Sequence, residues 1–241
     1  DFTMNAMAYD LKTETLIDPY NGLHDLETKK IRAVGNPEER FQEDLTRILR
    51  AIRFAAQLGF SIEEKTFKAA KKLSRRINDQ RMVQGAEKKE FIVAREKIGE
   101  ELSKAFIVDP MRTLELLQET RIFEILFPEI QAVIKNDTLY LKPIGQIKRS
   151  SLNATLSLLL RDLSGADAHS VLKRNGFLST EKGSEARVLE NDVVWIVEQM
   201  REPLTTKTVM TMPAHLFEGM FMNARGKTYK DALFALGRKT I

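Results

Sequence analysis

An acid and a base three residues apart, Asp44 and Arg47, are the pair in this sequence with the most definite chemistry. On a helix, side chains at this spacing lie on the same face. A carboxylate accepts hydrogen bonds and a guanidinium donates them in a planar fork, so the pair matches a base edge with an amino donor beside a ring-nitrogen acceptor. Cytosine and adenine have such an edge, whereas guanine and uracil would leave polar groups unpaired. The pair therefore predicts a helix that selects C and A through its side chains.

The same two residues also have a simpler interpretation. Acid–base pairs at this spacing are usually solvated ion pairs, worth about 0.2–0.5 kcal/mol, with no ligand involved. Both interpretations require a helix that presents Asp44 and Arg47 on its polar face, and this requirement leads to the surrounding sequence.

The helix expected to carry the pair spans Arg40 to Phe60. Pro37 suits the first helical turn with Asn36 as its cap, and Gly59 is expected to mark the end. Apolar residues recur at helical spacing opposite the charged face, which predicts a buried stripe. The stripe consists of Leu45, Ile48, Leu49, Ile52 and Ala56.

Short strands are expected before this helix and further helices after it. β-Prone or alternating residues predict strands over 1–10, 15–18 and 31–34. Ser61 and Glu64 have the spacing of a capping box, which predicts a helix that runs to Ile77.

The chain beyond residue 78 is expected to be helical after a connector over 78–85. A helix is predicted over 88–106, with Phe91, Ile98, Leu102 and Phe106 inward. Another is expected to begin at Asp109-Pro110, and more helical segments follow Ser150.

Composition excludes several classes of protein. The chain has 241 residues, 43% hydrophobic and 30% charged, with a formal net charge of +4, values that suit a globular protein and an RNA or nucleotide ligand. The lack of cysteine excludes disulfides and thiolate metal sites and favours a reducing compartment, so we expect a cytoplasmic protein. The three histidines are far apart, which argues against a histidine metal cluster. No apolar run reaches the roughly 18–20 residues of a membrane helix, so no membrane partner is expected.

Three consecutive segments resemble the motifs of one family, the class II tRNA nucleotidyltransferases, which comprise CCA-adding enzymes and bacterial poly(A) polymerases. DFTMNAMAYD resembles the end of R-R-D-F-T-x-N-A, and DPYNGLHDLETKKIRAVG resembles D-P-x-G-G-x-x-D-L…I-R-x-V-G. RFQEDLTRILRAIRFAAQLGF resembles R-F-x-E-D-x-x-R-x-L-R-A-x-R-F-A. One motif alone is a weak signal, but three in this order and spacing are specific. Asn21 replaces the first glycine of the family's Gly-Gly, and asparagine tolerates the left-handed backbone of such a turn.

The resemblance implies an α+β fold, in which the remnant of a polymerase-β-like nucleotidyltransferase sheet precedes an all-helical neck, body and tail. The C-terminal part of the head is expected over 1–35 and the helical neck, with the nucleotide-reading helix, over 36–108. The body is expected over 109–150 and a tRNA-binding tail over 151–241. Because the sequence begins with Asp1 inside the first motif, an N-terminal segment is expected to precede it.

The function implied by the resemblance is template-independent addition of C and A, from CTP and ATP, to the 3′ end of tRNA. The E-D-x-x-R segment of the family reads the incoming base, which assigns this role to Asp44 and Arg47. Arg50 and Arg53 resemble arginines that contact the nucleotide, and are expected to position it or its phosphates; alternatively, they hold the helix to acidic neighbours. Asp1 matches an aspartate that lies near the ribose.

Magnesium is the cofactor implied by the resemblance, because nucleotidyl transfer uses two divalent metal ions. The family holds them with an upstream D-x-D motif, which is expected before Asp1, so this chain should lack the catalytic carboxylates and be inactive alone. Basic residues beyond residue 60 are candidates for phosphate contacts with tRNA, or for ordinary solvated charge. They are Lys71, Lys72, Arg75, Arg76, Lys148 and Arg149.

Three alternatives to a CCA-adding enzyme stay open at this point. A poly(A) polymerase would retain the acid–base reader and use ATP alone. A CC-adding or A-adding specialist would differ in segments outside these motifs. A non-catalytic, helical RNA-binding module belongs to a different class altogether. The oligomeric state is also open, a homo-oligomer included.

Overall fold

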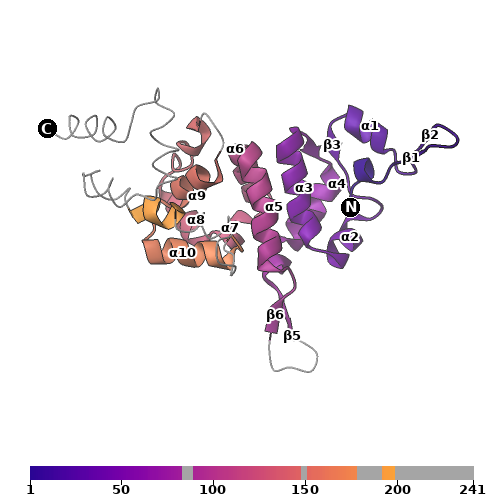
Figure 1. Ribbon diagram of the computed structural model, residues 1–241. Helices are drawn as coiled ribbons and strands as arrows, with labels where there is room; N and C mark the ends of the chain where they lie inside the picture. The colour runs from indigo at the N-terminus through magenta and orange to yellow at the C-terminus, as the bar shows by residue number, and fades with distance from the viewer. Residues whose placement is uncertain (83–88, 148–150, 178–191, 199–241) are drawn as a thin grey trace.

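The protein is mostly helical, with small two-stranded sheets beside the helices (Figure 1). The computed structural model describes residues 1–82, 89–147, 151–177 and 192–198. This arrangement agrees with the expected α+β class. The three predicted N-terminal strands do not form one common sheet, however, because the described strands pair as β1–β2, β3–β4 and β5–β6.

The first ten residues form a turn and a short strand instead of the single strand that alternation predicted. Buried Phe2 makes one antiparallel bridge to Ala33, the 3₁₀ turn η1 spans Thr3–Asn5, and β1 spans only Ala8–Asp10. The turn packs closely on the following helix, because a Cβ added to Gly22 would lie 2.4 Å from the carbonyl oxygen of Thr3. The chain at Thr3 is therefore seated directly against the helix that begins at Gly22.

The hairpin and helix that follow end in a short parallel pairing. Strand β2 (Thr15–Ile17) pairs antiparallel with β1, and helix α1 spans Gly22–Glu27. Asn21, with φ at 58°, adopts the left-handed backbone expected of the residue that replaces glycine. Strand β3 (Lys30–Ile31) pairs in parallel with β4 (Ser61–Ile62), so the predicted strand over 31–34 is shorter than expected.

Two helices replace the single helix predicted over Arg40 to Phe60. Helix α2 spans Pro37–Glu43 with Asn36 as its predicted cap, and α3 spans Thr46–Leu58 and ends at Gly59 as predicted. The prediction of one continuous helix is wrong because Asp44 has an extended backbone. Its carboxylate instead accepts a hydrogen bond from the backbone N–H of Thr46, 2.9 Å away, as N-cap side chains do.

The predicted apolar stripe is fully buried in spite of this break. Leu45 lies inside the break itself, yet it is buried, with only 2% of its surface exposed. The joint changes the direction of the chain but leaves the apolar stripe facing the core. The other members also belong to the core, namely Ile48, Leu49, Ile52 and Ala56.

Helix α4 (Glu64–Leu73) continues as the 3₁₀ helix η2 (Ser74–Asn78), close to the predicted end. The predicted capping box is wrong, since Glu63 is the N-cap and its side chain accepts from the Thr66 N–H. Ser61 cannot be the cap because it belongs to β4, where its N–H donates to the carbonyl of Lys29.

A hairpin occupies the place of the predicted connector and first helical turns. Strand β5 (Gln80–Met82) pairs antiparallel with β6 (Lys89–Phe91), and α5 begins only at Arg95 and spans Arg95–Val108. Phe91 was expected to point inward on a helix, and is instead 37% exposed on β6. The other three predicted inward residues of this segment are buried on α5, namely Ile98, Leu102 and Phe106.

The C-terminal helices pack on α5 and extend the same core. Helix α6 begins at Pro110 as predicted, and Asp109 caps it by accepting from the N–H of Arg112. The remaining elements are α6 (Pro110–Glu119), α7 (Phe123–Leu126), α8 (Pro128–Asn136), η3 (Ile144–Gln146), α9 (Leu152–Leu160) and α10 (Gly165–Arg174). Buried apolar side chains form one cluster from Phe2 to Val197. No helix in the described ranges is long and apolar enough to cross a bilayer. The boundaries at 35, 108 and 150 stay predictions.

Candidate functional site

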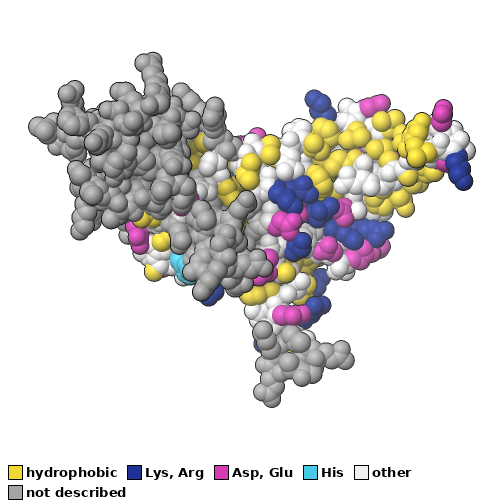
Figure 2. All heavy atoms as spheres, in the orientation of Figure 1, with side chains coloured by type: hydrophobic (Ala, Val, Ile, Leu, Met, Phe, Trp, Pro, Cys, Tyr) yellow, Lys and Arg dark blue, Asp and Glu magenta, His cyan; other side chains and the backbone are white. Residues whose placement is uncertain are grey.

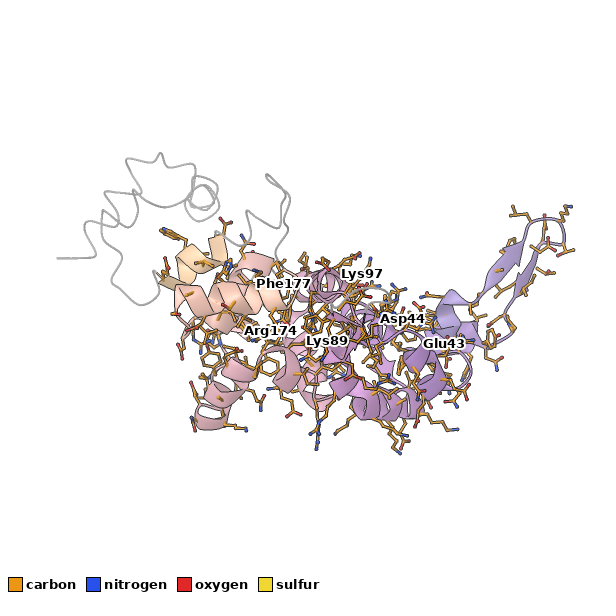
Figure 3. All side chains as sticks on the ribbon, turned by 90° about the horizontal axis from the view of Figure 1, so that it is seen from below. Glu43, Asp44, Lys89, Lys97, Arg174 and Phe177 are labelled. Carbon is orange, nitrogen blue, oxygen red and sulfur yellow. The ribbon has the colours of Figure 1, made fainter. Side chains whose placement is uncertain are left out.

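The predicted acid of the reader lies at the joint between α2 and α3. Asp44 is exposed and follows Glu43 at the end of α2, as Figure 3 shows. One carboxylate oxygen of Asp44 accepts from the Thr46 N–H, and this bond fixes the carboxylate at the first turn of α3. Within the described residues, the second oxygen has no hydrogen-bond partner, so it is open to a donor from a ligand.

The predicted base of the reader is engaged elsewhere. The Nη1 atom of Arg47 donates to Glu43, at 2.7 Å, and to the carbonyl of Arg40, at 2.8 Å. Its Nε is buried without a hydrogen-bond partner, 3.6 Å from a carboxylate oxygen of Asp1. The N–H of Arg47 donates to the backbone carbonyl of Asp44, at 3.1 Å. No side-chain hydrogen bond or ion pair joins the two residues in the described part of the chain, so the simple interpretation as an ion pair between them is wrong.

Glu43 is a functional candidate that sequence reasoning missed. Its carboxylate also accepts from Nη1 of Arg40, at 2.9 Å, so it links two arginines. Hydrogen bonds from Arg47 and then from Arg40 hold the pKa of Glu43 below its usual value, which keeps it charged. The signal was the helical spacing of Glu43 to both arginines, three residues from one and four from the other.

The next two arginines of α3 point toward carboxylates from distant parts of the chain. Arg50 forms an ion pair with Asp1, with Nε at 2.6 Å, and lies 3.7 Å from Glu101 of α5. Arg53 donates from Nε to Glu101 at 2.6 Å, and its guanidinium lies 4.0 Å from the centroid of the Phe54 ring. Arg50 is 31% exposed and Arg53 only 12%, so Arg50 is the more accessible to a ligand.

Acidic and basic side chains alternate over this surface, and Figure 2 shows them interleaved near α3 and α5. The structure thus brings together all five predicted site residues: Asp1, Asp44, Arg47, Arg50 and Arg53. The arginines are already paired with carboxylates, so an anionic ligand would compete with these acids for the guanidinium groups.

Glu101 is the second residue that sequence reasoning missed. It is 4% exposed and lies on the buried face of α5, three residues after Ile98 and four before Ala105. A glutamate inside an apolar stripe was the available signal, because a charge is rarely buried unless it is paired.

The aspartates before α2 have structural partners and do not fit a metal site. Asp18 accepts from the backbone N–H groups of Gly22 and Leu23 at the start of α1. Asp25 is 1% exposed and accepts from Thr3 and Arg32; burial opposes its ionisation, but these bonds and the charge of Arg32 outweigh it and lower its pKa. In the ranges that the structure describes, no three His, Asp or Glu residues are grouped to hold a metal ion.

The basic residues of α4 and η2 are partly neutralised. Lys72 forms an ion pair with Glu38 at 2.7 Å, and Arg76 forms one with Asp79 at 3.2 Å. Lys71 and Arg75 are exposed and, among described residues, have no such partner. The other two predicted phosphate contacts, at 148 and 149, lie outside the described residues.

Sequence comparisons relate the N-terminal part of the chain to known proteins. Residues 1–32 match the family model of the poly A polymerase head domain. A CCA-adding enzyme from Streptococcus uberis is 58% identical over 71 residues, which are 30% of this chain and 17% of the relative. One from Streptococcus mutans is 63% identical over 67 residues, 28% of this chain and 16% of the relative. The match thus spans about a sixth of the relatives' length.

Structural comparisons extend over nearly the whole chain. A CCA-adding enzyme in complex with ATP is similar with a TM-score of 0.55 at 21% identity, over 98% of this chain and 56% of the other. A Thermotoga maritima CCA-adding enzyme in complex with tRNA has a TM-score of 0.54 at 21% identity, over 98% and 54%. At this identity, the likeness is one of fold.

Proposed function

Since the matched N-terminal segment belongs to the family of CCA-adding enzymes and poly(A) polymerase heads, we propose that this chain takes part in adding C and A to the 3′ end of tRNA. The nucleotides would come from CTP and ATP, and Asp44 with Arg47 would read the base without a template. The observation that carries the proposal is the position of these two side chains at one joint, where a carboxylate oxygen is open and a guanidinium is held nearby.

The hydrogen bond from the Thr46 N–H supports the role of Asp44. A carboxylate fixed through one oxygen can accept the amino group of cytosine or adenine with the other, and does not have to lose rotational freedom on binding. Guanine and uracil present a carbonyl oxygen at this position, which an ionised carboxylate cannot satisfy because it only accepts.

Arg47 would supply the donors, either from Nη2, which has no hydrogen-bond partner among the described residues, or by releasing Glu43 from Nη1. A base edge that accepts from Nη1 would replace the bond to Glu43, which is the exposed partner, 50% accessible to solvent. The bond to the carbonyl of Arg40 can persist and keep the side chain in place. Base reading by Arg47 is therefore compatible with the contacts that hold its side chain at the joint.

The two following arginines are assigned to the nucleotide for different reasons. Arg50 pairs with Asp1 and is partly exposed, which suits a cation that turns toward phosphate oxygens, while Asp1 would then be free near the ribose. Arg53 is held by Glu101 and Phe54, which suits a fixed positive charge behind the site.

Magnesium would supply the activation of the attacking hydroxyl and of the α-phosphate when bound. The described carboxylates do not fit this ion. Asp1, Glu43 and Glu101 pair with arginines, and Asp44 is bound to the Thr46 N–H. Those of the head segment bond the backbone, Thr3 or Arg32. No step of the reaction is therefore assigned to a metal held by these residues.

The match of residues 1–32 to the poly A polymerase head domain favours one second candidate, addition of A alone. Full-length protein given tRNA without its 3′-terminal nucleotides, with labelled CTP or labelled ATP, separates the two. We expect both nucleotides to be incorporated. A chain of A from ATP alone would indicate the polymerase, incorporation of only C or only A a specialist, and binding without incorporation a non-catalytic RNA-binding module; each would overturn the proposal.

The reader assignment is tested in the same assay by Asp44→Ala and Arg47→Ala. We expect each to reduce the preference for CTP and ATP over UTP and GTP by about 100-fold or more, because a site built to hydrogen-bond one base edge rejects an edge with the wrong donors and acceptors. The control is Gln42→Ala, an exposed neighbour at the same joint. If base preference survives both changes while the control behaves as wild type, Asp44 and Arg47 do not read the base.

A further inference from the structure

We propose that one face of the β5–β6 hairpin docks the RNA substrate by stacking an unpaired base and contacting a phosphate. This inference rests on the proposed function and adds a surface to it. The hairpin extends away from the layer of helices, below α5 in Figure 1, and its six strand residues are all exposed. We call the face that carries Gln80, Met82, Lys89 and Phe91 the hairpin face.

The strand register separates the side chains of the hairpin into two different faces. Gln80 is opposite Phe91 and Met82 is opposite Lys89, and since alternate residues of a strand point to opposite sides, these four share one face. The other face carries Arg81 and Glu90, which form an ion pair at 2.7 Å and cancel each other's charge. The hairpin face is therefore apolar and cationic, without a carboxylate.

Exposed apolar side chains on this face are unusual for such a small element. Met82 is 60% exposed and Phe91 37%. Two-stranded hairpins are marginal in water and gain by burying apolar groups, yet these two remain open to solvent. They form a small platform, adequate for the face of one or two bases rather than for a protein interface, which needs about 1,000 Å².

The ring of Phe91 stacks against a neighbouring arginine in a way that suits base stacking. The guanidinium of Arg95 lies 3.5 Å from the centroid of its ring, and Nη1 of Arg95 donates to Asn78 at 2.8 Å, which anchors the stack to η2. One side of the ring is thus covered by a cation, and the exposed part of the ring is available to stack against a base. Aromatic rings with adjacent arginines are the usual platforms for unpaired bases in single-stranded RNA.

The charge near the hairpin face complements a phosphate backbone. Lys89, labelled in Figure 3, has no ion-pair partner within the described residues. The hairpin follows η2 in the chain, and the preceding α4 and η2 carry Lys71 and Arg75, which are exposed and have no ion-pair partner among the described residues. A second copy of the chain would bring the same positive charge to this face, which disfavours self-association.

The test measures binding of full-length protein to tRNA without its 3′-terminal nucleotides, by fluorescence anisotropy over a range of salt concentrations. Phe91→Leu keeps an apolar side chain and removes the π face, and we expect it to weaken binding at least about fivefold. Lys89→Gln should lower the slope of log affinity against log salt by about 1. The matched control is the double change Arg81→Gln and Glu90→Gln, which alters the opposite face at constant net charge and should bind as wild type.

The outcomes separate this inference from the proposed function. If wild type binds tRNA and adds nucleotides, but Phe91→Leu and Lys89→Gln match it in affinity and salt slope, the hairpin inference alone is overturned. A wild-type dimer that Phe91→Leu abolishes at unchanged RNA affinity would assign this face to self-association, and would also overturn it. If wild type neither binds nor extends tRNA, the proposed function is overturned, and the hairpin inference that rests on it is overturned as well.

Discussion

The two faces of α5 place neighbouring glutamates in opposite environments. Glu101 is 4% exposed and turned toward α3, where it accepts from Arg53 and lies 3.7 Å from Arg50. Glu100 is turned to solvent, 42% exposed, and accepts from Lys97 at 2.8 Å and Lys104 at 2.7 Å. Both glutamates therefore have two cationic neighbours, and the two sites differ mainly in exposure to solvent.

The difference between them is the cost of losing a partner. An exposed pair is screened by water and usually contributes less than about 1 kcal/mol. Removal of one member of a buried pair leaves a charge without compensation and costs about 3–5 kcal/mol. The free energy lost on removing a glutamate can therefore differ several-fold between adjacent positions of one helix, although each glutamate lies within 4 Å of two cations.

The largest expected effect is that of Glu101→Ala. It should lower the free energy of unfolding by about 3 kcal/mol, because Arg53 would stay largely buried without a carboxylate. Urea unfolding followed by circular dichroism measures this loss. Glu100→Ala is the matched control one residue away. Equal losses in the two variants would contradict the distinction between the faces.

A second change tests the packing of the inner face without altering charge. A Cβ on Gly99 would lie 2.0 Å from the carbonyl oxygen of Gly176, which is backbone and cannot rotate away. Gly99→Ala should therefore cost about 1–3 kcal/mol through overpacking, although alanine favours a helix. The same urea titration measures it, and a variant as stable as wild type would show that α5 does not approach Gly176 this closely.

The smallest expected effect belongs to the outer face and depends on pH. Hydrogen bonds from Lys104 and Lys97 lower the pKa of Glu100 to about 2. Since this folded-state pKa is depressed, the contribution of the pairs is present above about pH 4.3, the ordinary glutamate value, and is lost as the pH falls toward about 2. Solvent exposure limits the amount to less than about 1 kcal/mol.

Carboxyl NMR titration of Glu100 checks this prediction directly. Lys104→Gln should move its pKa upward toward the ordinary value, because the largest stabilising bond is lost. A pKa near 4.3 for Glu100 in the wild-type protein would mean that the two lysines do not form these hydrogen bonds when the protein is in solution.

Helix ends were predictable from sequence at residues that can adopt few other structural roles. Asn36 with Pro37, Gly59, and Asp109 with Pro110 all act as predicted, because a cap, a left-handed residue or a missing N–H leaves the chain few alternatives. Asp44 was misjudged because aspartate can sit inside a helix or cap the next one, and the buried stripe has the same spacing in both cases.

Tertiary contacts account for the parts that could not be predicted. Lys89, Glu90 and Phe91 have ordinary helical residue types, and only their pairing with β5 makes them a strand. The role of Glu101 depends on the proximity of α5 to Arg53, a residue 48 positions away, which no local pattern contains. Three motifs, in contrast, predicted the partial-length match to CCA-adding enzymes and to the poly A polymerase head domain, since the order of motifs can be read without knowledge of the fold.

The joint at Asp44 means that the angle between α2 and α3 is not fixed by a continuous ladder of backbone hydrogen bonds. The side chain of Arg47 acts as a brace across it, joining α3 to both Glu43 and the backbone of Arg40 on α2. The bend of the chain at this joint therefore depends on the side chains of Arg47 and Glu43 as well as on the backbone.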